Sequence, residues 1–154
     1  MIDRACFRKL LLQLAADRPA DFVGLGVIAY STIKGLPVVP LGSVPNAHPD
    51  LPVSGENNVM LTLASLATRR STRHDGFHLI EANSGNLTHV AQFVSPPLDA
   101  ALANPHADWP HGARQMTALL ISTLPQVEIA AVVSADGDVQ LYENGAQTIS
   151  GVHK

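Results

Sequence analysis

Cysteine and charge are both scarce in this sequence. Cys6 is the only cysteine among 154 residues, which excludes an intrachain disulfide and a zinc site built from several thiolates. Charged residues make up 15% of the chain, and the formal net charge is −3. A small negative charge gives no overall attraction to nucleic acid or to an anionic membrane, so we predict neither as a partner. Phosphate binding would have to be local, through single arginines and backbone amides.

Long hydrophobic runs are also absent. No window approaches the roughly 18–20 apolar residues that cross a bilayer. The start of the chain does not resemble a signal peptide, because Arg8 and Lys9 divide its apolar residues at helical spacing. Apolar residues still make up 46% of the sequence, enough for a substantial core. We therefore predict a single cytoplasmic domain covering residues 1–154.

Hydrophobic periodicity predicts alternating helices and strands, and hence an α/β (α+β mixed) fold with a central mixed sheet flanked by helices. Asp3 and Ser54 are the expected helix caps, and Arg69 and Arg70 are expected in the last turn of the second helix. The predicted helices cover 3–17, 57–70 and 112–125, and the strands cover 21–32, 37–41 and two hairpins at 77–94 and 127–145. One further helical turn is expected within 98–112. The proline-rich segment 34–55 is long enough to be a lid, although its composition equally fits a static surface loop.

Asp75 and Gly76 stand where a helix gives way to a strand, in the sequence "STRHDGF". A carboxylate there can bind a divalent metal, and a following glycine lets a ligand approach the backbone. Asp-Gly is equally a favourable turn dipeptide. Spacing alone favours the turn interpretation.

Gly112, Ala113 and Arg114 open the third predicted helix. Free backbone N–H groups at a helix start favour anions, and the planar guanidinium of Arg114 is suited to phosphate. A glycine loop followed by a solvated arginine would give the same pattern.

Histidines and serines give weaker signals. His78 and His89 are expected to face each other across the hairpin, where a metal could bind. The histidines, which include His74, His106 and His111, lack regular metal-ligand spacing, so a dedicated metal site has little support. Ser122 and Ser134 lack the glycine-flanked motif of a nucleophilic serine, so hydrolase chemistry has little support.

Three segments, taken in order, resemble the diadenylate cyclase domain family. Asp75-Gly76-Phe77 resembles an Asp-Gly-Ala motif that opens a hairpin, and the run from Gly112 to Ala118 (GARQMTA) resembles a Gly-Thr-Arg-His-Arg-Ala-Ala helix start. Val132-Val133-Ser134, followed by Asp136, stands where the family has a Val-Val-Ser-Glu hairpin. The resemblance covers roughly residues 57–145.

This resemblance implies a mixed sheet surrounded by helices, with an ATP site between the first two motifs. Paired domains of the family condense two ATP molecules into cyclic di-AMP: a 3′-hydroxyl attacks the α-phosphorus of the other ATP, and pyrophosphate leaves. Asp75 would hold Mg²⁺ or Mn²⁺ near the attacking hydroxyl, Gly76 would allow close approach, and Arg114 would bind phosphate. The other nucleotide-binding residues that the resemblance implies are Phe77, Gly112, Ala113, Gln115, Thr117 and Ser134.

The sequence departs from the family at the cationic motif. Arg-His-Arg becomes Arg114-Gln115-Met116, which removes an imidazole and a guanidinium. Each charged hydrogen bond lost from such a site typically raises the barrier by about 2–4 kcal/mol. Phe77 in place of alanine either narrows the site or offers a face on which a base can stack. We therefore predict a nucleotide-binding sensor module, with ATP or a cyclic dinucleotide as ligand and a homodimer or higher oligomer as its assembly.

Two alternatives remain open. In an active, metal-assisted cyclase, Asp75 would be catalytic, and Arg73, His74 or His111 would supply the missing cations. In a protein-interaction domain without a small ligand, Trp109 within "NPHADWPHG" would dock a partner.

Overall fold

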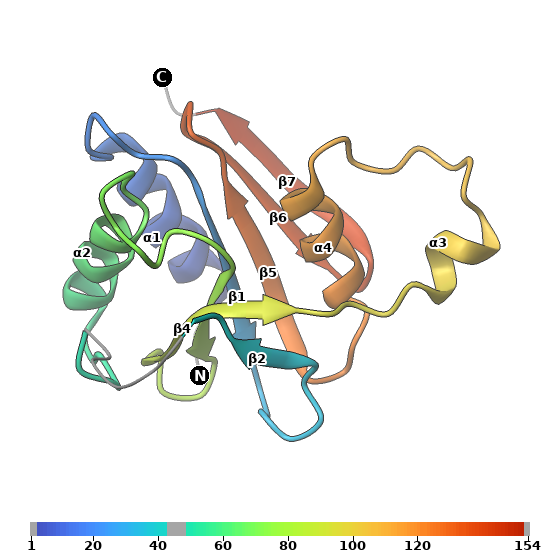
Figure 1. Ribbon diagram of the computed structural model, residues 1–154, viewed down its shortest axis with the longest axis horizontal. Coiled ribbons are helices and arrows are strands. Elements are labelled where there is room, and N and C mark those ends of the chain that lie inside the picture. Colours follow the sequence, from blue (N-terminus) through green and yellow to red (C-terminus); the bar gives the residue numbers. More distant parts are fainter. Residues whose placement is uncertain (1–2, 43–48, 153–154) are drawn as a thin grey trace.

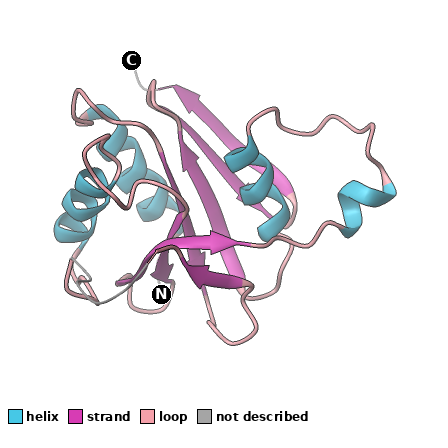
Figure 2. Cartoon of the chain, in the orientation of Figure 1, coloured by secondary structure: helices cyan, strands magenta, loops and turns pink. Residues whose placement is uncertain are grey.

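A seven-stranded mixed sheet forms the centre of the computed structural model, which describes residues 3–42 and 49–152. The strand order is β2-β4-β3-β1-β5-β6-β7, with helices on both faces (Figures 1 and 2). The strands are β1 (Leu25–Tyr30), β2 (Val38–Pro40), β3 (Phe77–Glu81), β4 (Leu87–Val94), β5 (Val127–Val133), β6 (Asp138–Glu143) and β7 (Ala146–Val152). The helices are α1 (Arg4–Ala16), α2 (Glu56–Leu66), α3 (Asp99–Ala103) and α4 (Ala113–Ile121). The predicted fold class is confirmed.

Strand β1 is buried along its whole length, as its nearly continuous apolar sequence predicts. It pairs in parallel with β3 and antiparallel with β5. Gly26 lies inside this strand because the ring of Phe77 occupies the space beside it: a Cβ on Gly26 would lie 2.6 Å from Phe77 Cε2.

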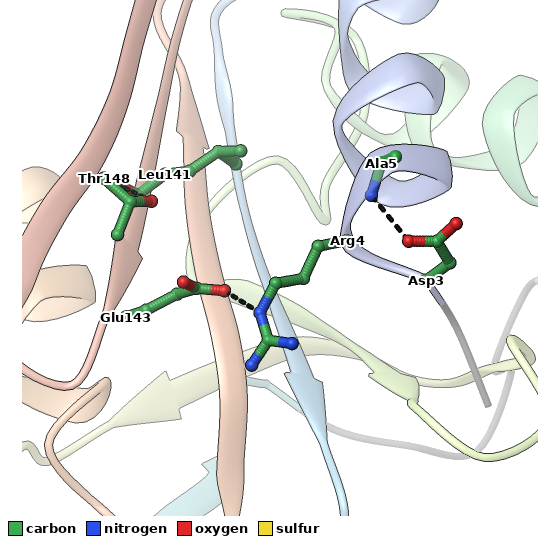
Figure 3. A network of polar contacts seen from close by, with 6 residues as sticks. All are labelled: Asp3, Arg4, Ala5, Leu141, Glu143 and Thr148. Atoms are coloured by element: carbon green, nitrogen blue, oxygen red, sulfur yellow. Dashed lines mark hydrogen bonds and ion pairs between the residues drawn. The ribbon is translucent and has the colours of Figure 1, made fainter.

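The sheet separates two hydrophobic cores. Apolar residues of α1 and α2 fill the core on one face, while α4 covers the other face. Asp3 caps α1 as predicted, since its Oδ1 accepts a hydrogen bond from the Ala5 N–H at 3.0 Å. Arg4 of the same helix forms an ion pair with Glu143 at the end of β6 (Figure 3). Within the described residues, no helix is long and apolar enough to cross a membrane.

Two predictions about α2 are wrong. Gly55, not Ser54, is its N-cap, with φ of +91° and no side-chain capping bond. The helix ends at Leu66, so Arg69 and Arg70 lie beyond its last turn. The reason is tertiary: the Ala67 carbonyl accepts from Val23 N–H, and Arg69 N–H donates to the Asp21 carbonyl. These bonds draw the chain away from the helix and toward the segment that precedes β1.

The C-terminal hairpin is confirmed as β5 and β6, and a further strand follows it. Gly137, with φ of +92°, makes the turn between β5 and β6 and donates its N–H to the Ser134 carbonyl. Strand β7 was not predicted, because its sequence AQTISGV lacks apolar alternation. It forms by pairing with β6 along its whole length, from Ala146 opposite Glu143 to Val152 opposite Asp138.

Strand directions determine where functional residues gather. Strands β1 and β3 are parallel, so they begin at the same edge of the sheet. Strand β5 is antiparallel to β1, and β4 is antiparallel to β3, so β4 and β5 end at that edge. Arg114, at the start of α4, reaches the residues before β1 and β3 at this edge. The predicted motifs therefore meet there although the sequence separates them widely.

Candidate functional site

The start of α4 carries backbone donors without side-chain caps. Gly112 is the N-cap in an extended conformation, and no side-chain capping bond to the helix start is made by the described residues. The first intrahelical bond runs from Met116 N–H to the Gly112 carbonyl. The N–H groups of the residues between them have no partner within the helix, as at any helix start.

Arg114 is held next to this helix start. Its Nη2 donates to the His74 carbonyl at 3.3 Å, and its Nη1 lies against Gly24, where a Cβ would be 3.2 Å away. Burial lowers the pKa of Arg114, while the nearby carboxylate of Asp75 raises it. The guanidinium remains charged, because its pKa starts far above neutrality. The His74 carbonyl is its one hydrogen-bond partner among the described residues, so most of its donors are free for a ligand.

A small hollow of about 220 Å³ opens beside Arg114. Arg114 is the charged group of a largely apolar lining that includes Gly76, Phe77, Phe93, Ala113 and Thr117. The structure thus brings together residues from two of the three predicted motifs. Phe93, at the end of β4, is 53% exposed and borders the same hollow.

Gly76 and Phe77 both line the hollow, and each is also constrained by contacts within the fold. Gly76 has φ of +79°, and a Cβ there would lie 2.6 Å from the Gln92 carbonyl oxygen, so the close approach is to strand β4. Phe77 is 4% exposed and packs on Gly26 in the α4-side core, so only a small part of its ring borders the hollow. Phe93 is the exposed aromatic, and sequence reasoning did not identify it. Position 93 is exposed between buried Gln92 and Val94, but β4 has no regular polar alternation that would mark this position in the sequence.

Asp75 lies beside the hollow without lining it. Its side chain is 79% exposed, and its Oδ1 is 3.7 Å from His74 Nε2. His74 Nδ1 lies 2.6 Å from the Ser71 carbonyl, and since a carbonyl can only accept, this nitrogen carries the proton. Within the described ranges no cluster of three histidine, cysteine or acidic side chains exists. The residues present therefore fit only a metal that takes most of its ligands from the phosphates of a bound nucleotide.

The side of α4 that faces away from the hollow carries Gln115, which lies near Gly112 and Ser134. Gln115 Nε2 is 3.5 Å from Ser134 Oγ, and both Gly112 and Gln115 line a second cavity of about 570 Å³. Ser134 also forms the β5–β6 turn, because its N–H donates to the Asp138 carbonyl. The predicted nucleotide-binding residues that line a cavity are thus divided between two cavities, while Asp75 and Ser134 line neither.

The histidine pair predicted across the hairpin is wrong. Leu79 is the partner of His89 in the register, and successive side chains point to opposite faces, so His78 and His89 are on opposite sides of the sheet. His78 is fully buried, and its Nδ1 accepts from Ala91 N–H at 3.1 Å. Burial, assisted by the charge of Arg114, lowers the pKa of His78 to about 4.

The remaining candidates are positioned away from the hollow. Ser122 Oγ donates to the Leu119 carbonyl and accepts from Gly145 N–H, so it is a structural residue and not a nucleophile. Trp109 Nε1 donates to the Asn104 carbonyl, and its ring, like His111, lines the cavity of about 570 Å³. Arg73 lines a different hollow, beside α2. Part of the predicted lid, residues 43–48, lies outside the described residues.

Comparison with solved structures finds this fold elsewhere. A hypothetical membrane spanning protein from Bacillus cereus matches with 18% sequence identity and a TM-score of 0.61, over 96% of this chain and 63% of that one. This chain thus spans less than two thirds of the Bacillus cereus protein. A double mutant of DacA from Staphylococcus aureus, a diadenylate cyclase, matches with 15% identity and a TM-score of 0.59, over 94% of this chain and 83% of that one. No family model and no curated protein matches. The chain therefore has a diadenylate-cyclase-like fold, and at these identities the similarity shows the fold alone.

Proposed function

We propose that this chain is a nucleotide-binding module whose site is the hollow beside Arg114. The observation that carries the proposal is the guanidinium of Arg114, which is held at the start of α4 with most of its donors free. A phosphate placed there would accept from Arg114 and from the uncapped N–H groups of the helix. These donors are fixed before the ligand arrives, which reduces the entropy lost on binding.

Phe93 supplies the second half of the proposed site. Its ring is 53% exposed at the border of the same hollow, where a purine can stack. Stacking of a base on an aromatic ring contributes about 1–3 kcal/mol. The ligand class that fits is therefore a nucleotide with at least one phosphate, such as ATP or a cyclic dinucleotide.

The size of the hollow supports an assembly of more than one copy. At about 220 Å³ it is smaller than the roughly 300–1,000 Å³ of enclosed small-molecule sites, so most of a nucleotide would lie on the surface. A second copy of the chain placed over the site would cover the exposed part. A homodimer or higher oligomer is therefore part of this proposal.

Binding without turnover is favoured over a cyclase. Arg114 is the cation of the hollow, while two of the three cations predicted to compensate for the lost motif lie elsewhere: Arg73 beside α2 and His111 in the cavity of about 570 Å³. His74 is the exception, because its Nε2 faces Asp75. This pair alone supports the cyclase as a second candidate function.

Replacing Arg114 by glutamine tests the binding proposal. ATP, AMP and cyclic di-AMP are titrated by calorimetry into the parent protein, Arg114→Gln and Arg69→Gln, an exposed arginine outside the hollow. A charged hydrogen bond contributes about 1.5–3 kcal/mol, so Arg114→Gln should weaken binding of the preferred nucleotide about 10- to 100-fold. Arg69→Gln should bind as the parent does. The absence of binding of every nucleotide to the parent protein, or equal binding to Arg114→Gln, would contradict the proposal.

A separate experiment tests the second candidate. The protein is incubated with ATP and Mn²⁺ and the products are analysed by mass spectrometry, with Asp75→Asn as the control. Cyclic di-AMP that disappears in Asp75→Asn would establish the cyclase. Intact ATP, together with measurable ATP binding, would favour the sensor.

A further inference from the structure

One face of strand β6 carries an unusual series of buried polar atoms. Asp138, Gln140 and Tyr142 alternate along the strand, so their side chains share one face of the sheet. This is the face that α4 covers, because Tyr142 belongs to the α4-side core. Asp138 Oδ1, Gln140 Oε1 and Tyr142 OH are all buried and have no hydrogen-bond partner among the described residues.

Such groups are rare in a native protein. An unsatisfied buried polar atom typically destabilises the fold by about 1–3 kcal/mol, so a series of them on one strand requires an explanation. Tyr142 is the clearest case, since the residue is only 1% exposed and phenylalanine would fill the same space without the hydroxyl. A ligand that supplies the missing partners would explain the series.

Two residues of the series border an open cavity of suitable size. Gln140 and Tyr142 line the cavity of about 570 Å³, which lies between α4, the segment 107–112 and the start of β7. This volume falls within the roughly 300–1,000 Å³ of small-molecule sites. Trp109 borders the cavity from the segment before α4, and Gln115 borders it from α4 itself.

The lining determines which ligands fit. Among the described residues it contains no lysine or arginine, and its ionisable side chains besides Tyr142 are Asp108 and His111, so these residues offer a phosphate no permanent cation. Its unpartnered atoms are an amide oxygen and a phenol, which bind neutral donors and acceptors. Trp109 already donates its N–H to the Asn104 carbonyl, so the face of its indole is the part available to a ring.

We propose that this cavity binds an uncharged ring compound that bears hydroxyl or amino groups, of the size of a nucleoside or a monosaccharide. Gln140 and Tyr142 exchange hydrogen bonds with those groups, and Trp109 contacts the ring. The site is independent of the proposed nucleotide site, because Ala113, Arg114 and Thr117 face the small hollow while Gln115 and Leu119 face this cavity.

The titration of Tyr142 agrees with this role. Burial, followed by the negative charge of Asp138, raises the pKa of the Tyr142 phenol. The hydroxyl therefore stays protonated at neutral pH and can both donate and accept.

The two tyrosines of the chain provide a matched pair of variants for the test. Tyr30 is 4% exposed, and its OH lies 2.7 Å from Thr88 Oγ1, so Tyr30→Phe removes a made hydrogen bond. The Tyr142 hydroxyl has no such partner among the described residues, so Tyr142→Phe removes a hydroxyl without breaking a hydrogen bond. Without ligand, we expect Tyr30→Phe to lower Tm and Tyr142→Phe to leave Tm unchanged or to raise it.

Binding is followed through Trp109, the only tryptophan of the chain. Adenosine and methyl glucoside are the uncharged probes, and AMP is the charged one. At least one uncharged probe should change the fluorescence of Trp109, and Tyr142→Phe should weaken that binding about three- to tenfold while Tyr30→Phe leaves it unchanged. A response to adenosine identifies a nucleoside-type ligand, and a response to methyl glucoside identifies a sugar.

AMP separates this site from the nucleotide site. AMP bound beside Arg114 should shift the backbone amide resonances of Gly76 and Phe93, whereas the uncharged probe should shift those of Gly145 and Gln147. The inference is overturned if neither uncharged probe binds in the millimolar range or below. It is also overturned if Tyr142→Phe binds as the parent does, or lowers Tm as much as Tyr30→Phe.

Discussion

The two sides of helix α4 present opposite chemistry. On one side, Arg114 brings a permanent charge to a small hollow with an exposed phenylalanine at its border. On the other side, Gln115 faces a cavity of about 570 Å³ whose described lining has no lysine or arginine. Two buried atoms of that lining, Gln140 Oε1 and Tyr142 OH, have no hydrogen-bond partner among the described residues. Successive helix residues differ by about 100° in direction, so neighbouring positions on this nine-residue helix line different cavities. A motif that is continuous in sequence can therefore serve two sites.

Gly76→Ala should have the largest effect, and Gly76 lines the small hollow but not the cavity on the other side of α4. The new Cβ would lie 2.6 Å from the Gln92 carbonyl oxygen at a residue with φ of +79°. We expect the free energy of unfolding to fall by about 3–5 kcal/mol, measured by urea denaturation.

Gly85→Ala is the matched control for this variant. Gly85 has φ of +75° but nothing within 4 Å of its Cβ position, so it isolates the backbone strain of about 1 kcal/mol. Equal losses in the two variants would show that the contact with β4 is not what requires glycine at position 76.

A change of pH tests the core beneath Arg114. His78 has its pKa lowered from 6.5 to about 4 by burial and by Arg114, so the unfolded chain binds a proton that the folded protein excludes. Stability from this group is complete above pH 6.5 and is lost as the pH falls to about 4. The loss is about 3 kcal/mol, since each pKa unit corresponds to about 1.36 kcal/mol.

Urea denaturation between pH 7 and pH 4 measures this loss. His78→Gln should flatten the dependence on pH, whereas His106→Gln, at an exposed histidine, should leave it as in the parent. If His78→Gln retains the full dependence, other groups account for the loss and His78 is not the origin.

Gln115→Leu gives the smallest effect and sharpens the comparison. The bond from Gln115 Nε2 to Ser134 Oγ is long, at 3.5 Å, so its loss should change the free energy of unfolding by less than about 1 kcal/mol. Binding of an uncharged probe should weaken while nucleotide binding stays unchanged, as measured by fluorescence and calorimetry. Weaker nucleotide binding would place Gln115 in the Arg114 site and remove the separation of the two sides.

Much of the fold could be predicted from the sequence, because its signals are local. The apolar run of β1, the cap at Asp3 and the turn at Gly137 each follow from residue type and spacing. Strand β7 could not be predicted, because it depends on pairing with β6 and not on its own pattern. The end of α2 was missed for a similar reason: backbone bonds to residues 21 and 23 fix it.

The site was predictable only where a residue acts through its type. Arg114 was singled out by its residue type at a helix start and by the resemblance of GARQMTA to the family's helix start, and the structure places it in the lining of the hollow. Phe93 and Tyr142 were not identified, because the exposure of one ring and the missing partner of the other arise only from tertiary packing. The packing of Phe77 on Gly26 could not be predicted, because the space beside Gly26 that accepts its ring is created by pairing of two distant strands.

The position of β1 at the centre of the sheet also has a consequence for folding kinetics. Gly26 of β1 pairs with Phe77 of β3 and with Val132 of β5. These partners lie about 50 and about 100 residues farther along the chain. Both closures lose chain entropy before the pairing compensates for it, which typically slows folding. During synthesis, the central strand cannot complete its hydrogen bonding until β5 has left the ribosome. The first half of the chain must therefore wait with its most apolar strand only partly paired, and this interval is when the protein is most exposed to aggregation.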